Sequence, residues 1–569
     1  MKSLSFLVLS LFVFLSGSCR KDFLISEPVG DLNKFNLATD KGIETLLVGA
    51  YSMLDGVSSE VGGWESASSN WVFGSIRGME ANFGSDEGDQ GDKNSLQNFN
   101  ETSTQSYLNI KWREIYEAVS RCNSVIVVIN QALASGKIDQ SKADMYLGQA
   151  RALRGWYHFE AWRMWKMIPY IDEKTDAASA TNTEDISSKI IDDLSAGIAL
   201  TENMGSIGKF NGTVVKVLLA KVLMQMNHDY SAALVLLEKA KDGTKPDGSP
   251  IGLAPTYGEI FDIVNRNGIE SVYTVQYSVN DGSLGWNGGY GEVLNFPYKN
   301  GPAGCCGFFQ PTQEFVNSFR TSGGLPLLDN SYSLNPVKND EGIVVSTLFI
   351  PDTGPLDPRL DWTVGRRGIP YWDWGLHTGA DWIRNQEYAG PYSPKKQVYK
   401  KSDAGIYTEI DSWTQGFTAN GYRMIRFSDI LLLLAECQIE TNDLAGALIN
   451  INAIRSRAAN PAGWVKMPDG TNAANYQISV YPAFPDQDYA RKALRMERKL
   501  ELGLEGHRYF DLNRWNITVD ELNRVLTYEK SMPWGHSLYW DAIVGPEDVT
   551  FPIPQHQIDI SSGNLVQNR

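Results

Sequence analysis

The sequence is poor in the side chains and motifs that enzymes use most often. It contains only six histidines and five cysteines among 569 residues. It has no H-E-x-x-H, no G-x-S-x-G, no phosphate-binding G-x-x-x-x-G-K-[ST], and no G-x-G-x-x-G in front of a predicted helix. None of the histidines lies beside an obvious serine or cysteine partner. We therefore predict that the protein is not an enzyme and needs no cofactor.

Basic residues and long apolar segments are also scarce. The chain has 51 Lys and Arg against 67 Asp and Glu, which gives a formal charge of −16. Neutralising a phosphate backbone requires clustered cations, so this balance argues against a nucleic-acid partner. Beyond the N-terminal segment no stretch has 18 consecutive apolar residues, so no transmembrane helix is predicted there. Hydrophobic residues make up 42% of the chain, which is an ordinary globular composition.

The first residues have the pattern of an export signal. Lys2 precedes an apolar run over residues 4–15, and small residues follow it up to Cys19. The run is too short to span a bilayer, which takes about 20 residues. It resembles a bacterial lipoprotein signal, although Ser16 stands where leucine is usual. The resemblance implies that residues 1–18 are removed and that Cys19 carries a lipid anchor. The alternative is an ordinary cleaved signal.

The four other cysteines do not have the spacing of a zinc site. Cys122 and Cys437 lie in helical patterns, where we expect them to be buried as small apolar residues. Cys305 and Cys306 are adjacent in the loop GPAGCCGFFQP. Outside the cell such a pair can form a vicinal disulfide. Two reduced thiols packed in a turn are an equally good interpretation.

An acidic loop, SDEGDQGDKN, contains Asp86, Glu87, Asp89 and Asp92. Its spacing differs from that of an EF-hand, in which ligands alternate and a bidentate glutamate follows. We predict a solvated acidic loop with no metal site, and calcium is the alternative.

Helical periodicity dominates both ends of the chain. Residues 112–129, 150–168, 186–200, 214–226 and 230–240 are predicted helices, and so are 430–435, 444–457 and 489–504. Ser428 or Asp429 is expected to cap the helix that begins there. A shift of 214 residues aligns Leu218, Asp229 and Ala233 with Leu432, Asp443 and Ala447. This repeat is typical of tetratricopeptide-type helix–turn–helix units, in which the small alanine lets two helices cross closely.

Between these regions lie long irregular stretches, 56–103 and 243–427, rich in Gly, Pro, Asn, Ser and aromatic residues. Irregular stretches of this length usually carry function. The predicted fold is all-α, or mainly α, with a tetratricopeptide-like scaffold and a large irregular ligand-binding lobe. The predicted parts are residues 19–260, the irregular lobe 261–427, and residues 428–569, which complete the scaffold.

Tryptophan is abundant, with 16 residues, and about half of them lie in the irregular stretches among Gly, Asn and Asp. Aromatic rings bind the flat C–H faces of sugars, and neighbouring polar groups orient the hydroxyls. Two clusters, 281–290 and 371–382, have this composition. The predicted ligand-binding residues are Trp71, Asp281, Trp286, Asn287, Tyr290, Arg366, Trp372, Asp373, Trp374 and Trp382. For each tryptophan the alternative is that it packs its loop against the helices.

Several segments together resemble the SusD/RagB family of outer-membrane nutrient-binding lipoproteins. They are CRKDFL, ARALRGWYHFEAWRMWKMIPYIDE, DPRLDWTVGRRGIPYWDWG, RMIRFSDILLLLAECQIETND, ALININAIRSRA, RMERKLELGLEGHRYFDLNRW and FPIPQHQIDI…NLVQN. The resemblance implies an all-α fold with tetratricopeptide-like repeats, a cell-surface location and a SusC-like TonB-dependent transporter as partner. It also implies capture of glycans, or less often peptides, without catalysis.

In the segment RMERKLELGLEGHRYFDLNRW, Glu497, Glu501 and Glu505 recur at four-residue steps. Paired carboxylates could serve acid–base chemistry. Nearby arginines would instead keep them ionised, so we predict a structural salt-bridge network, with Arg498, Arg508 and Arg514 among its members.

We therefore expect a surface lipoprotein that captures oligo- or polysaccharide and delivers it to a transporter. The alternatives are a peptide-binding lid of such a transporter and, less in keeping with the motifs, a surface glycoside hydrolase.

Overall fold

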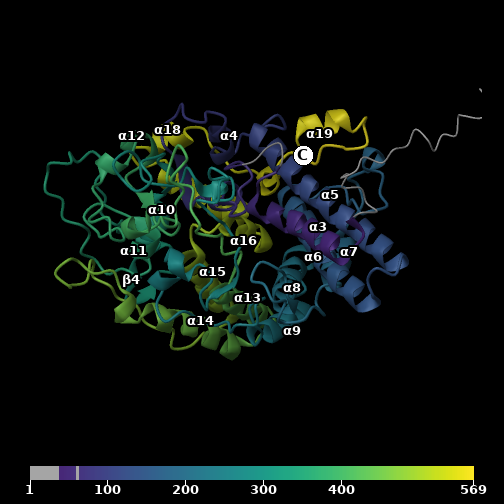
Figure 1. The fold of residues 1–569 in the computed structure, drawn as a ribbon. Helices are drawn as coiled ribbons and strands as arrows, with labels where there is room; N and C mark the ends of the chain where they lie inside the picture. The colour runs from purple at the N-terminus through teal and green to yellow at the C-terminus, as the bar shows by residue number, and fades with distance from the viewer. Residues whose placement is uncertain (1–36, 59–62) are drawn as a thin grey trace, which may run out of the picture.

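A computed structural model describes residues 37–58 and 63–569 (Figure 1). The long helices from both ends of the chain gather in the right and lower parts of Figure 1, and the loop-rich segment occupies the left. The mainly α prediction is confirmed. One large hydrophobic core draws buried residues from all three predicted parts of the chain. Cys19 and the predicted signal lie outside the described residues.

The N-terminal half of the scaffold consists of long antiparallel helices. They are α3 (Asp40–Ser52), α5 (Ser106–Ala134), α6 (Gln140–Trp165), α7 (Ser187–Ser195), α8 (Gly212–Val222) and α9 (Tyr230–Lys241). Thr39 caps α3, since its side chain accepts a hydrogen bond from the Gly42 amide. The predicted stripe of α6 is buried, and most residues between its members are buried too, so this part of the helix is enclosed on nearly all sides. The stripe residues within α6 are Ala150, Leu153, Tyr157, Ala161 and Met164.

The second half repeats this arrangement with α13 (Phe427–Glu440), α14 (Leu444–Ala458) and α15 (Gln487–Leu502). Helix α8 packs on α9, α13 packs on α14, and α9 packs on α13, so the two predicted repeat units stack directly. Ala233 and Ala447 are fully buried at corresponding positions of α9 and α14. The repeat inferred from the 214-residue shift is therefore present in the fold.

The predicted cap of α13 is wrong. The helix begins at Phe427, and its N-cap Arg426 makes no side-chain capping bond. Asp429 instead forms buried ion pairs with Lys221 at 2.7 Å and Arg498 at 2.9 Å. A buried carboxylate is costly unless it is paired, and these two cations satisfy it better than the helix terminus would.

The rest of the described chain contains short elements. The helices are α4 (Lys93–Gln97), α10 (Gln313–Asn317), α11 (Leu360–Thr363), α12 (Gln386–Ala389), α16 (Arg508–Arg514), α17 (Thr518–Glu529), α18 (Gly535–Tyr539) and α19 (Gln555–Ile560). The strands form four antiparallel pairs: β1 (Ala81–Gly84) with β3 (Phe308–Pro311), β2 (Ser271–Tyr273) with β8 (Ile425–Arg426), β4 (Thr321–Ser322) with β5 (Leu325–Pro326), and β6 (Val364–Gly365) with β7 (Ser393–Pro394). None of the helices in the described ranges is long and apolar enough to cross a membrane.

The three glutamates of α15 and the turn after it form the predicted salt-bridge network, but with other partners. The ion pairs are Arg359 with Glu497 (2.5 Å), Arg455 with Glu497 (2.9 Å), Arg457 with Glu501 (2.6 Å), Arg426 with Glu505 (2.7 Å) and Lys396 with Glu505 (2.7 Å). Burial alone would raise the pKa of Glu505, but the charges of Arg426 and Lys396 lower it to about 2. Glu505 therefore stays ionised. The ion pairs of the three glutamates tie α15 to the irregular lobe and to α14.

Candidate functional site

Three aromatic rings form a stack on the surface of the irregular lobe. The ring centroids of Trp286 and Tyr290 lie 5.0 Å apart with their planes inclined by 17°, and those of Tyr290 and Trp64 lie 5.9 Å apart at 5°. Trp286 keeps 56% of its surface exposed, whereas Tyr290 and Trp64 are partly buried beneath it. Stacked rings at these distances stabilise one another. The stack therefore holds an exposed indole on a base of two further rings.

A second loop adds two aromatic residues beside this stack. The Phe417 centroid lies 5.4 Å from that of Tyr290, and Trp413 meets Phe417 edge to face at 5.7 Å. Trp413 is 60% exposed, whereas Phe417 is buried. We call Trp64, Trp286, Tyr290, Trp413 and Phe417 the aromatic platform. It combines two exposed indoles with a packed support, from three segments far apart in the sequence.

Hydrogen bonds of Asn280 join the two loops that carry the exposed indoles. Its side-chain amide donates to the carbonyls of Gly405 and Thr408 and accepts from the Ile410 amide at 3.1 Å. Its backbone N–H donates to the Glu409 carboxylate at 2.9 Å. Four bonds from one residue fix the spacing between the loops, so the platform is held in place before any ligand arrives.

Two glycines let the rings approach the backbone. A Cβ on Gly285 would lie 2.7 Å from the Phe417 ring, and one on Gly63 would lie 2.3 Å from the Tyr290 ring. Both have positive φ angles, +94° and +128°, which residues other than glycine rarely adopt. Glycine is therefore required at both positions for the rings to pack as they do.

Polar groups surround the platform. The Asn287 amide donates to the Asp281 carboxylate at 2.9 Å, and Asp281 also accepts from the Ser278 hydroxyl and the Ser283 amide. The bonds from Ser278, Ser283 and Asn287 hold the pKa of Asp281 well below its usual range. This exposed carboxylate is thus an ionised hydrogen-bond acceptor beside Trp286, as is useful for orienting a hydroxyl-rich ligand.

The four predicted residues of the first cluster, Asp281, Trp286, Asn287 and Tyr290, therefore lie together. Trp64, Trp413 and Phe417, which lie against them, were not among the predicted ligand-binding residues. The only signal for the two tryptophans is their place in aromatic-rich irregular stretches, because their contact with Tyr290 arises through the fold.

The second predicted cluster is organised differently. The indole N–H of Trp374 donates to the Tyr399 carbonyl at 2.9 Å, and that of Trp372 to the Lys395 carbonyl at 3.4 Å. The Asp373 carboxylate accepts from the backbone amides of the turn at residues 401–402. Both indoles are half-buried with their polar atoms already bonded to the backbone. These contacts pack the lobe against itself, whereas the stated alternative was packing of the loop against the helices.

Three predicted ligand residues are corrected by their burial. Trp71 is 1% exposed and donates its indole N–H to the Gly291 carbonyl, and Trp382 is 5% exposed. Arg366 is 3% exposed and forms a bidentate pair with Asp361 at 2.7 and 2.9 Å. None of the three offers surface to a ligand: Trp71 belongs to the large hydrophobic core, Trp382 to a smaller one in the lobe, and Arg366 to a buried ion pair.

The remaining cysteines have definite positions. Cys305 and Cys306 are joined by a disulfide in the loop beside the platform. In that loop the Ala303 carbonyl accepts from the Thr414 hydroxyl at 3.0 Å, next to Trp413. Cys122 and Cys437 are buried free thiols, as predicted.

Basic side chains of the protein pair with the acidic loop. Arg384 pairs with Asp86 at 2.6 Å and with Asp89 at 2.5 Å, and the Lys93 ammonium donates to the carbonyls of both aspartates. In the described part of the chain no group of three or more His, Cys, Asp or Glu could hold a metal ion. Lys93 and Arg384 thus pair with oxygens of this loop, and whether it binds calcium stays a matter for experiment.

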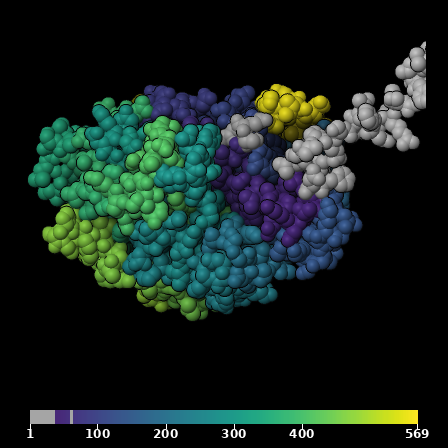
Figure 2. Space-filling model, in the orientation of Figure 1, coloured from purple at the N-terminus to yellow at the C-terminus, as the bar shows by residue number. Residues whose placement is uncertain are grey.

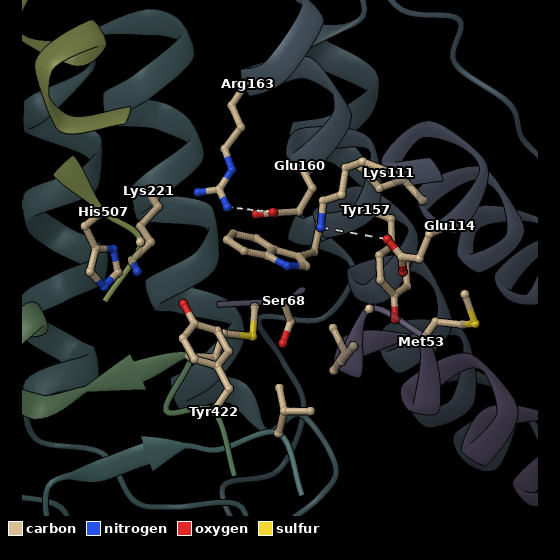
Figure 3. A pocket seen from close by; sticks show the side chains of 17 residues that line it. Met53, Ser68, Lys111, Glu114, Tyr157, Glu160, Arg163, Lys221, Tyr422 and His507 are labelled. Atoms are coloured by element: carbon tan, nitrogen blue, oxygen red, sulfur yellow. Dashed lines mark hydrogen bonds and ion pairs between the residues drawn. The ribbon is translucent and has the colours of Figure 1, made fainter. Parts of the chain in front are cut away.

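A small pocket of about 50 Å³ lies between α5, α6 and the segment at residues 422–424 (Figure 3). Lys111 pairs with Glu114 at 3.9 Å, and Arg163 pairs with Glu160 at 2.6 Å. Burial raises the pKa of Glu114 to about 8. The pocket has room for a few water molecules but not for a sugar ring. Its carboxyl groups are therefore poorly placed to act on a polysaccharide.

Comparison with known proteins places this geometry in a family. The family model described as the SusD family matches residues 269–569, which is more than half of the chain. The chain belongs to the SusD family. A second model, described as "starch-binding associating with outer membrane", matches residues 67–235 of this SusD-family protein. The resemblance stated from the sequence is thus confirmed.

Relatives and solved structures extend the match over nearly the whole SusD fold. The SusD-like protein P25 of Formosa agariphila is 22% identical over 79% of this chain and 76% of its own. A SusD superfamily protein of Bacteroides vulgatus has a TM-score of 0.68 at 17% identity, over 94% of this chain and 99% of its own. Surface glycan-binding protein A of Bacteroides thetaiotaomicron, solved with laminarihexaose, has a TM-score of 0.64 at 21% identity, over 93% and 99%. At these identities the solved structures establish the fold.

Proposed function

We propose that this SusD-family protein captures oligo- or polysaccharide at the cell surface and delivers it to a SusC-like TonB-dependent transporter without breaking bonds. The observation that carries the proposal is the aromatic platform, on which Trp286 and Trp413 remain more than half exposed. Two exposed indoles on one packed aromatic support offer ring faces that a ligand can cover. Sugar rings fit, since their C–H faces stack on aromatic rings and their hydroxyls reach groups such as Asp281 and Asn287.

Similar proteins support the ligand class. Surface glycan-binding protein A was solved with laminarihexaose, and another solved structure of this fold, with a TM-score of 0.64, is described as a laminarin-binding SusD-like protein. The second matching family model carries the description of starch binding. Different glycans on one fold are consistent with a binding surface made of loops, which vary while the helical scaffold stays the same.

The N-terminal sequence and the family support the proposed location. The second family model describes association with the outer membrane, and Cys19 follows a short apolar segment of lipoprotein type. We expect Cys19→Ala to move the protein from the membrane fraction to the soluble fraction. A Ser18→Ala variant is the matched control. Co-purification of a TonB-dependent transporter with the tagged wild type would support the proposed partner.

Affinity electrophoresis through gels containing neutral and acidic polysaccharides tests the ligand class. We expect at least one polysaccharide to retard the wild type, and the double variant Trp286→Ala/Trp413→Ala to migrate as in a gel without polysaccharide. Trp540→Ala is the control, because this indole is 70% exposed but lies outside the platform. If the double variant is retarded as strongly as the wild type, the platform is not the binding site.

Two further outcomes would replace the proposal. Release of new reducing ends from a bound polysaccharide by the purified protein would mean that it is a glycoside hydrolase. Binding of peptides, with no polysaccharide retained, would favour the peptide-binding lid.

A further inference from the structure

An open cleft of about 400 Å³ lies directly beside the aromatic platform. Its walls are α3, the turn at residues 206–209 and the segment at residues 273–278. Figure 2 shows α3, in purple, on the face turned toward the viewer. Pockets that bind small molecules usually measure about 300–1,000 Å³, so the cleft is large enough for a ligand.

The cleft and the platform share residues. Asn287, which lines the cleft, directly follows Trp286 in the chain and bonds Asp281 at the platform rim. Its carbonyl accepts the Ser278 amide at 2.9 Å, and Ser278 lines the cleft as well. Asn287 therefore belongs both to the lining of the cleft and to the rim of the platform.

The lining suits a sugar. Tyr51, Tyr273 and Tyr277 line the cleft, but Tyr273 and Tyr277 are only 3% and 9% exposed, so the partly exposed Tyr51 is the tyrosine whose ring a ligand can reach. Its hydroxyl is already bonded to protein at 2.8 Å. Val48 on α3 is 65% exposed at the cleft wall, and the Asn287 amide supplies a polar contact. Apolar surface with a few polar groups is the usual lining of a carbohydrate site.

The charges select against acidic ligands. Among the described residues that line the cleft, Lys209 is the one cationic side chain, and it pairs with Glu44 at 3.6 Å. Asp55 also lines the cleft, but burial raises its pKa to about 7, so it is only partly ionised near neutral pH and contributes little negative charge. At the platform the Asp281 carboxylate is ionised. A uronic acid or sulfate group would meet this carboxylate, and the described lining of the cleft has no unpaired cation to receive it.

We propose that the cleft is a second subsite for one neutral glycan chain, whose other sugars stack on the aromatic platform. The proposal rests on the proposed function and adds two properties to it: a preference for neutral chains, and affinity that increases with chain length until the cleft is filled.

The test fills the cleft without touching the platform. Gly208 lines the cleft, has no left-handed backbone, and a Cβ there would meet only the Gln276 side chain, at 3.9 Å. Gly208→Phe therefore places a ring in the cleft at little cost to folding. Val48→Arg, on the opposite wall, is a second blocking variant. Val235→Phe, on the exposed side of α9, is the control, since this valine is 50% exposed outside the cleft.

Isothermal titration would use laminari-, cello- and malto-oligosaccharides from disaccharide to hexasaccharide. For the series that binds, we expect the wild type to bind the hexasaccharide about tenfold or more tightly than the trisaccharide. Gly208→Phe and Val48→Arg should lose this gain and keep the affinity for the trisaccharide. Trp286→Ala should weaken binding of both lengths, and Val235→Phe should behave as the wild type.

The outcomes separate the cleft from the platform. If both blocking variants keep the length dependence of the wild type, the cleft is not a subsite, although the platform remains one. If Trp286→Ala leaves binding of every length unchanged, the proposed platform fails instead. If the wild type binds none of the neutral series, or if alginate or polygalacturonate retards it more strongly than neutral polysaccharides do, the preference for neutral chains is refuted.

Discussion

Replacing Trp286 with alanine should lower the affinity for glycan much more than it lowers the stability of the fold. A tryptophan side chain covers roughly 150–250 Å² when fully buried, and this one is 56% exposed, with one face stacked on Tyr290. A sugar on the other face would cover on the order of 60 Å² of it. At about 25 cal/mol per Å² this contact contributes about 1.5 kcal/mol, or roughly a tenfold change in affinity. The lost stack on Tyr290 should lower stability by only about 1 kcal/mol.

The assay is isothermal titration with the polysaccharide that retards the wild type most, together with thermal unfolding of each variant. Trp286→Ala should raise Kd about tenfold, whereas Trp286→Phe should keep most of the affinity because a ring remains. Trp540→Ala should change neither quantity. An unchanged Kd for Trp286→Ala, with the variant folded, would refute the stacking argument. A large loss of stability would show that the residue is structural.

Three further predictions follow from the charges and from the second cluster. Trp374→Ala should lower the melting temperature and leave glycan binding unchanged in affinity electrophoresis, because this indole bonds the Tyr399 carbonyl inside the lobe; weaker binding without a stability loss would contradict this. Burial raises the pKa of Glu529 to about 8, above its unfolded value. The stability that the protonated carboxyl group contributes is therefore complete below about pH 4 and is lost as the pH rises toward 8. Glu529→Gln should flatten the decline in melting temperature between pH 5 and 8. An unchanged slope would contradict this prediction. EDTA should leave the melting temperature unchanged, because Lys93 and Arg384 already pair with the oxygens of the acidic loop; a drop restored by calcium would show that a metal binds.

The helical scaffold was predictable because its signal is local. Residues that a helix must bury recur every three or four positions, and the alanines at helix crossings recur in both repeat units. The sequence predicted that a salt-bridge network exists, but not which residues pair in it. Acidic residues at four-residue steps among arginines indicated ion pairs, but Glu497 pairs with Arg359 and Arg455 instead of its sequence neighbour Arg498. Which cation reaches a buried carboxylate depends on the packing of distant segments.

The same limit applies to the candidate site. Trp286 and Trp382 have similar neighbours in the sequence, yet one is 56% exposed and the other 5%. Composition around a residue does not determine whether its loop faces solvent or the interior of the lobe. The contacts between Trp64, Tyr290 and Phe417 join three distant segments, and no periodicity within any one of them signals their meeting.

The sequence by itself determined the helical repeats, the family, and the absence of the motifs on which common enzymes depend. Each of these is recognised from a local sequence pattern. Only the tertiary structure decided which aromatic residues form a surface. Trp71 is buried in the core, Trp372 and Trp374 pack inside the lobe, and Trp286 and Trp413 remain exposed to solvent. The physical reason is that exposure is a property of the whole packing: an indole stays exposed only where no other segment of the chain covers it.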